Sequence, residues 1–427
     1  MKSRKSFFLL WLFIFPNLFS TIILVTSFSK PFHTSSLPFF SAGGVSNYNV
    51  TQSVKYQVDI NFTLTHNSLS SGDYWFKFSR LNDRQPNNTL TQYCPPYQES
   101  KILFSQITAP SYVLKDKFNN TYDLFNTTLN YHNSISVDQK YNITLNEVSF
   151  KNINMSEIGI YNMSDEVFDL YCNNSETYYE RDNPTLIAVS NSIVNPSDNP
   201  VEKAEKVCDW VANYLTYDNF MPAQEQGALW AYNNQRGDCS EYSSLMITLL
   251  RIQNIPARKV TGFCISANPK TKPYVGQEWT FNSYLTGGYL YSNFLGHAWV
   301  EYYVENIGWI ACDPTWHSSG FDYFNRIDYL RFNLNIGQWF SIPLLSDQSE
   351  FPHPCIVYEL ASDFDYDYQF KVKALEVTLS SGDGTLSNDF LILLLVITLS
   401  AILVITLVAI LIITKKRRKK EVIFHEY

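Results

Sequence analysis

The sequence lacks the closely spaced His and Cys patterns that usually bind a metal ion. It contains neither a CxxC pair nor an HExxH segment, and only His297 and His317 lie within residues 183–335, where the strongest motifs occur. Zinc sites need several such ligands at short spacing. We therefore expect no metal ion and no other cofactor.

Positive charge is also scarce in the middle of the chain. Residues 31–388 carry 22 Lys and Arg against 37 Asp and Glu, a net charge of −15, whereas the whole 427-residue chain is at −8. Such an acidic surface repels phosphate backbones. Nucleic acid is therefore not expected as a partner.

Charged residues are missing altogether from residues 390–413, which are mostly apolar. A helix of about 20 apolar residues crosses a bilayer, so we predict one transmembrane helix over residues 389–414. Six basic residues follow at 415–420. Because Lys and Arg are enriched on cytoplasmic flanks, they place a short tail, residues 415–427, inside the cell.

The start of the chain is typical of a secretory signal, with Lys2, Arg4 and Lys5 before an apolar stretch. Residues 1–29 are predicted to be a cleaved signal peptide or an uncleaved anchor. Both alternatives put residues 30–388 outside, which predicts a single-pass cell-membrane protein with an extracellular domain. Protease added to intact cells should digest that domain and spare the tail, whereas protection of the region around Cys239 would reverse the orientation.

Acceptor sites for N-glycosylation are confined to the first half of the chain. The pattern Asn-x-Ser/Thr occurs at Asn49, Asn61, Asn87, Asn119, Asn126, Asn142, Asn154, Asn162 and Asn173, and not after that. Apolar residues alternate with polar ones over residues 48–64, and short strand patterns at 74–76 and 141–145 are separated by turn-forming residues. We predict a glycosylated, β-rich domain over residues 30–182, built as an antiparallel sandwich.

Apolar residues recur at helical spacing from about residue 185. Asn199 and Pro200 are typical of a helix start, a second helix is expected over residues 224–233, and a third starts at Cys239 and ends before Pro256. Strands are expected over residues 258–265, 297–304 and 309–313. The prediction is an α+β fold with a core over 183–335 and an extension and linker over 336–388.

Cys239, His297 and Asp313 fit one chemical mechanism. A cysteine at a helix start faces unpaired N–H groups and the positive end of the helix dipole, which stabilise a thiolate. His297 opens one predicted strand and Asp313 ends the next. A thiol nucleophile needs a base, and the imidazole needs a third group that fixes its tautomer. Taken singly, each residue is more often structural.

Three segments resemble the transglutaminase-like superfamily of cysteine proteases and acyltransferases. RGDCSEYSSLMITLLRIQNIPARKVTGF is similar to its nucleophile helix and following strand, GHAWVEYYV to its His strand and GWIACDPTW to its Asp strand. The resemblance implies a papain-like core over about residues 186–335, with Cys239 as nucleophile, His297 as base and Asp313 as orienter. It leaves the second oxyanion-hole donor open among Trp230, Tyr232 and Gln235.

These observations predict a membrane-tethered extracellular thiol enzyme. It would hydrolyse or transfer amide or peptide acyl groups of a protein or peptide substrate at the cell surface through a Cys thioester. Hydrolysis is favoured because residues 186–335 contain no recognisable amine pocket. The alternative is a catalytically silent binding or surface-interaction protein that keeps the fold as a scaffold.

Two further expectations concern the cysteines and the residues around them. The odd number of seven cysteines predicts that Cys239 is the one free thiol and that the other six are mostly paired. The tripeptide Arg236–Asp238, which matches an adhesion motif, is interpreted as a helix cap. His317 is interpreted as a loop residue and not as the base.

Overall fold

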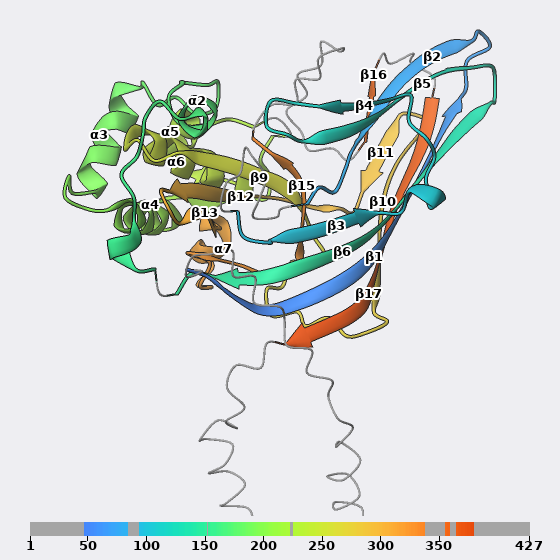
Figure 1. Ribbon diagram of the computed structural model, residues 1–427. Helices are drawn as coiled ribbons and strands as arrows, with labels where there is room; N and C mark the ends of the chain where they lie inside the picture. Colours follow the sequence, from blue (N-terminus) through green and yellow to red (C-terminus); the bar gives the residue numbers. More distant parts are fainter. Residues whose placement is uncertain are drawn as a thin grey trace, which may run out of the picture. The chain divides into compact units, whose positions relative to one another are not determined.

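A long strand with one buried face is central to the first layer of the fold. β1 (Asn49–His66) buries the alternating residues Val54, Tyr56, Val58, Ile60, Phe62 and Leu64, as the sequence pattern predicts. β6 (Ser134–Ser149) pairs antiparallel with one edge of β1 and β17 (Phe364–Leu379) with the other. Figure 1 shows β1, β6 and β17 as long neighbouring strands of one curved sheet.

The computed structural model describes residues 47–83, 94–151, 153–222, 225–337, 355–358 and 364–379. The predicted signal peptide, transmembrane helix and cytoplasmic tail lie outside these residues. Within these ranges, no helix is long and apolar enough to cross a membrane.

The sheet around β1 combines strands from distant parts of the sequence. Its order is β11 (Tyr289–Ser292), β10 (Glu278–Thr286), β17, β1, β6 and β14 (Arg326–Ile327), and β3 (Gln98–Ile102) also pairs with β6. A second sheet has the order β16 (Cys355–Tyr358), β2 (Gly72–Ser79), β5 (Thr121–Leu129) and β4 (Tyr112–Lys115). The ring of Phe62 in β1 lies 5.1 Å from Phe76 and 5.2 Å from Phe78 in β2, so the two sheets share one core.

This arrangement differs from a self-contained β-domain that ends at residue 182. β10 and β11 come from the predicted core, and β17 comes from the predicted linker, yet all three belong to the sheet of β1. The long β1 exposes hydrogen-bonding groups on both edges, and β17 covers the edge that β6 leaves open. A separate sandwich domain is therefore not confirmed, and the domain limits stay a prediction.

A smaller sheet and the helices form a second hydrophobic core. The strand order is β13 (Gly308–Cys312), β12 (Leu295–Val304), β9 (Ala257–Cys264) and β15 (Arg331–Ile336). The helices are α2 (Glu166–Tyr171), α3 (Pro184–Ile193), α4 (Pro200–Tyr214), α5 (Ala228–Asn234), α6 (Cys239–Ile252) and α7 (Pro314–Ser318). In Figure 1, α3, α4 and α5 gather around α6.

Short elements complete the fold. They are the 3₁₀ turns η1 (Phe104–Gln106) and η2 (Met155–Glu157) and the parallel pair β7 (Thr216–Tyr217) and β8 (Arg236–Gly237). The predicted helix start at Asn199 is confirmed, because its side chain accepts the backbone N–H groups of Val201 and Glu202. The fold is mixed and rich in strand.

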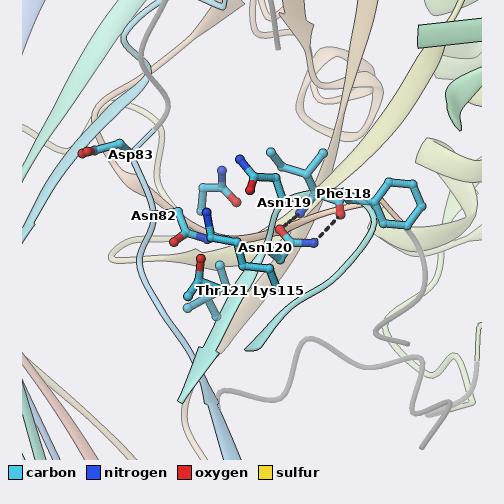
Figure 2. Close-up of a pocket in the computed structure, with 10 residues that line it drawn as sticks. Asn82, Asp83, Lys115, Phe118, Asn119, Asn120 and Thr121 are labelled. Atoms are coloured by element: carbon cyan, nitrogen blue, oxygen red, sulfur yellow. Dashed lines mark hydrogen bonds between the residues drawn. The ribbon is translucent and has the colours of Figure 1, made fainter. Parts of the chain in front are cut away.

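A polar cavity lies beside the edge strand β15. Its empty volume is about 640 Å³, including space open to solvent. Figure 2 shows Asn119, Asn120 and Thr121 close together at this cavity. The Asn120 amide exchanges two hydrogen bonds of 2.8 Å with the backbone of Ile336 and so ties the loop before β5 to β15. None of the three predicted catalytic residues lines this cavity.

Candidate active site

Cys239 is the first residue of α6, as the sequence predicts. The carboxylate of Asp238 accepts the N–H of Ser240 at 2.8 Å, and the carboxylate of Glu241 accepts the N–H of Asp238 at 3.1 Å. This capping box satisfies N–H groups that a helix start leaves without partners. Residues 241–251 of the helix are buried, so α6 presents its first residue from a rigid position.

Burial opposes the helix dipole at the Cys239 thiol. Desolvation raises the pKa of Cys239 well above its ordinary value, and the negative charge of Asp238 raises it further. A hydrogen bond from the backbone N–H of Ala298 and the charge of Lys259 act in the opposite direction without reversing the shift. The helix position alone predicts a thiolate, but the environment in the structure favours a neutral thiol that needs a base.

The side chains of His297 and Asp313 contact each other close to this thiol. His297 lies in β12, Asp313 directly follows β13, and His297 Nε2 is 2.6 Å from Asp313 Oδ2. Both side chains are buried. Because Nε2 is engaged by the carboxylate, Nδ1 is the ring nitrogen that can accept a proton. Ala298, the neighbour of His297, hydrogen-bonds the sulfur of Cys239, so the structure brings all three predicted residues to one place.

Asp313 is held through both of its carboxylate oxygens. Oδ1 caps α7 by accepting the N–H groups of Thr315 and Trp316, each at 3.0 Å. Burial alone would raise the pKa of Asp313, but the charges of His297 and Arg331 hold it below its usual value. The carboxylate is therefore ionised although it is buried.

Arg331 and Tyr217 also belong to this site, and no sequence motif predicts either of them. Arg331 Nη2 lies 2.9 Å from Asp313 Oδ2. Tyr217 pairs with Gly237 just before Cys239, and burial, followed by the charges of Cys239 and Asp238, raises the pKa of Tyr217 to about 12. Arg331 could have been noticed as a lone basic residue in an apolar strand pattern, but nothing distinguishes Tyr217 among the 29 tyrosines.

The side chain of His317 is engaged outside the His297–Asp313 pair, and the other sequence candidates stay unassigned. His317 lies in the short helix α7 and not in a loop as interpreted from the sequence, and its Nε2 is 2.9 Å from Asp209 Oδ1 in α4. Trp230 and Tyr232 lie in α5, and Gln235 caps its C-terminus in a left-handed conformation with φ of 52°. The second oxyanion-hole donor therefore remains open among these three residues.

The expectation of paired cysteines is wrong for the residues described. Cys172, Cys208, Cys239, Cys264 and Cys312 are free thiols. All of these except Cys239 are buried, and Cys208 and Cys312 pack in a hydrophobic core, which needs no disulfide. Cys239 differs from the others because it is partly exposed. An odd count therefore does not single it out, but its accessibility does.

The region around this site is similar in sequence to known proteins. The family model described as the transglutaminase-like superfamily matches residues 187–314. An uncharacterised protein of Bacillus subtilis, YebA, is 26% identical over 184 residues, which are 41% of this chain and 23% of that protein. A protein-glutamine gamma-glutamyltransferase of Pseudomonas aeruginosa is 36% identical over 86 residues, 20% of this chain and 11% of that protein.

Solved structures resemble a larger part of the chain. A candidate cysteine protease of Cytophaga hutchinsonii aligns with 79% of this chain and 94% of its own, at 14% identity and a TM-score of 0.43. The periplasmic domain of TgpA from Pseudomonas aeruginosa aligns with 65% of this chain and 96% of its own, at 14% identity and a TM-score of 0.32. By sequence, this chain spans less than a quarter of the length of each of the two curated relatives, YebA and the gamma-glutamyltransferase.

Proposed function

We propose that this chain is a thiol enzyme acting on amide or peptide acyl groups, on the premise that residues 187–314 match the transglutaminase-like superfamily. The observation that carries the proposal is the 2.6 Å contact between His297 and Asp313 beside Cys239. A nucleophile at a helix start, a base and a buried acid that orients the base are the groups that acyl transfer requires. Cys239, His297 and Asp313 take these three roles.

The raised pKa of Cys239 favours a neutral thiol at the start of the proposed reaction. His297 Nδ1 takes the thiol proton as the sulfur attacks the acyl carbon. The new S–C bond forms, the C–N bond breaks, and the imidazolium returns the proton to the departing amine. Water then attacks the thioester, gives the carboxylic acid and restores the thiol. Asp313 stabilises the transient imidazolium and keeps Nε2 engaged.

We favour hydrolysis over transfer to an amine. Transfer requires a site that holds a lysine-like amine and keeps water away from the thioester. The acidic middle of the chain would attract cationic chains, but attraction raises the encounter rate without aligning a nitrogen. Protein or peptide substrates at a cell surface are the proposed class.

Export and a membrane tether are part of the same proposal. They rest on the apolar segments at both ends of the sequence and on the basic residues that flank them. The start of β1 and the end of β17 are neighbours, since Gln52 pairs with Leu379. The first and last described strands therefore begin and end at the same end of this sheet, as attachment of both chain ends to one membrane would require.

Labelling with chloroacetamide, a small thiol-reactive amide, tests the proposed nucleophile. In the full-length native protein we expect label on Cys239 and not on the five buried cysteines. We also expect the rate to fall about 100-fold in His297→Gln, because the neutral thiol then has no base. Peptide mapping after timed labelling measures both. An unreactive Cys239, or equal rates in the two proteins, would instead support the binding-protein alternative.

A further inference from the structure

The guanidinium of Arg331 is enclosed between aromatic rings behind the candidate active site. Its carbon lies 3.9 Å from the ring centre of Trp316 and 4.5 Å from that of Tyr323. The side chain has no solvent exposure. A buried charge is costly unless it is paired and hydrogen-bonded, so the partners of Arg331 decide whether it has a role beyond packing.

Arg331 bridges two buried carboxylates. Nη2 lies 2.9 Å from Asp313 Oδ2, and Nη1 lies 2.7 Å from Asp328 Oδ2. β15, which begins at Arg331, and β13, which Asp313 follows, stand at opposite ends of the strand order of their sheet. The ion bridge therefore links the two edge strands of this sheet through Asp313, the residue proposed to orient the base.

The same oxygen of Asp313 serves His297 and Arg331. Oδ2 accepts His297 Nε2 at 2.6 Å and Arg331 Nη2 at 2.9 Å, while Oδ1 is engaged by the start of α7. Rotation of the carboxylate would break contacts on both oxygens. Arg331 thus fixes the direction from which Asp313 meets the imidazole, and it shares the negative charge that would otherwise act on the imidazolium alone.

We infer that Arg331 is a positioning residue for the His297–Asp313 pair, and that its charge sets the lower pH limit at which Cys239 can be activated. The inference rests on the proposed function, because it assigns a control to that same site. In Arg331→Met we expect Asp313 to stay ionised, because the hydrogen bonds from His297, Thr315 and Trp316 remain and favour the carboxylate. Its full charge then stabilises the imidazolium more strongly, so the base is lost to protonation at a higher pH.

Other ionisable groups around the pair belong to several elements. They are Asp238 and Cys239 near the start of α6, Tyr217 of β7, Lys259 and Cys264 of β9, and Tyr323 and Asp328 from the segment between α7 and β15. Asp328 is the group among them that pairs with Arg331 and can change its effect on Asp313. Replacement of Asp328 should therefore act in the direction opposite to replacement of Arg331.

The test measures the pH at which the chloroacetamide labelling rate of Cys239 falls to half, in the full-length protein. Arg331→Met should raise this pH by roughly one unit, which is about a tenfold slower reaction well below the midpoint. Asp328→Asn should lower it, because the arginine charge then acts more fully on Asp313. Arg331→Lys keeps the charge and should stay near the wild-type midpoint.

Arg258→Met is the matched control. Arg258 forms an equally buried pair with Glu301 at 2.7 Å in the same sheet, and its guanidinium stacks 3.7 Å from the ring of Trp309. Its loss should lower the thermal midpoint of unfolding without moving the labelling midpoint. If Arg331→Met does not fold, the Asp328 and lysine variants carry the test.

Failure of the proposed function and failure of the inference about Arg331 give different results. A wild-type Cys239 whose labelling does not depend on His297 would remove the proposed function itself. A normal, His297-dependent wild type whose midpoint is unchanged in Arg331→Met and Asp328→Asn would overturn only the inference and leave Arg331 as a structural ion bridge.

Discussion

Replacement of Cys239 with alanine is expected to lower peptide turnover by at least about 10⁴-fold, because no thioester can form. The measurement uses full-length protein with glutamine-containing and general peptides, with and without a labelled primary amine. In the wild type, hydrolysis should exceed incorporation of the amine. Both products should vanish together in Cys239→Ala, since both reactions pass through the same thioester.

Cys172→Ala serves as the control for this substitution. Cys172 is a buried thiol directly after α2, where its sulfur contacts the carbonyl of Arg251. Its replacement should change stability modestly and leave the turnover per folded molecule within about twofold. Amine incorporation that outpaces hydrolysis would make the protein a transferase. A wild type that turns over no peptide would favour a binding protein that keeps the fold.

Asp313→Asn should lower turnover by roughly 10³- to 10⁴-fold while preserving the size of the side chain. An asparagine can present its N–H to the imidazole, which favours the wrong tautomer, and it carries no charge to stabilise the imidazolium. The structure adds a second reason, because Arg331 would lose one of its two carboxylate partners. Initial rates with the best peptide of the previous experiment measure the effect.

The chain offers a matched aspartate–histidine pair as a control. Asp209 lies 2.9 Å from His317, and its side chain is 56% exposed whereas that of Asp313 is fully buried. An exposed pair contributes little, so Asp209→Asn should stay within about twofold of the wild type. Circular dichroism should show that both variants are folded. Asp313→Asn with more than a tenth of wild-type turnover would contradict the role given to Asp313.

Local patterns explain why parts of the fold could be predicted. The alternation along β1 depends on adjacent residues pointing to opposite faces, and the caps of α4 and α6 depend on side chains within three residues. Asp313 before Pro314 similarly indicates the end of β13. These features are local, so the sequence shows them directly.

Pairing between distant segments could not be predicted in the same way. β17 falls within the predicted extension and linker, yet it covers the free edge of β1, and β10 joins that sheet from inside the predicted core. Several strands of similar composition could have covered that edge. Which of them does so depends on the burial of the whole sheet, and no single segment carries that information.

By itself, the sequence determined the three candidate catalytic residues, the helix start that presents Cys239 and the superfamily that these motifs resemble. The motifs are short, and each contains its chemical group together with the local structure that positions it. Only the tertiary structure decided that the pKa of Cys239 is raised and that Arg331 forms an ion pair with Asp313. Desolvation and ion pairing depend on what surrounds a group in space, and Arg331 is brought to Asp313 from the far end of the strand order of its sheet.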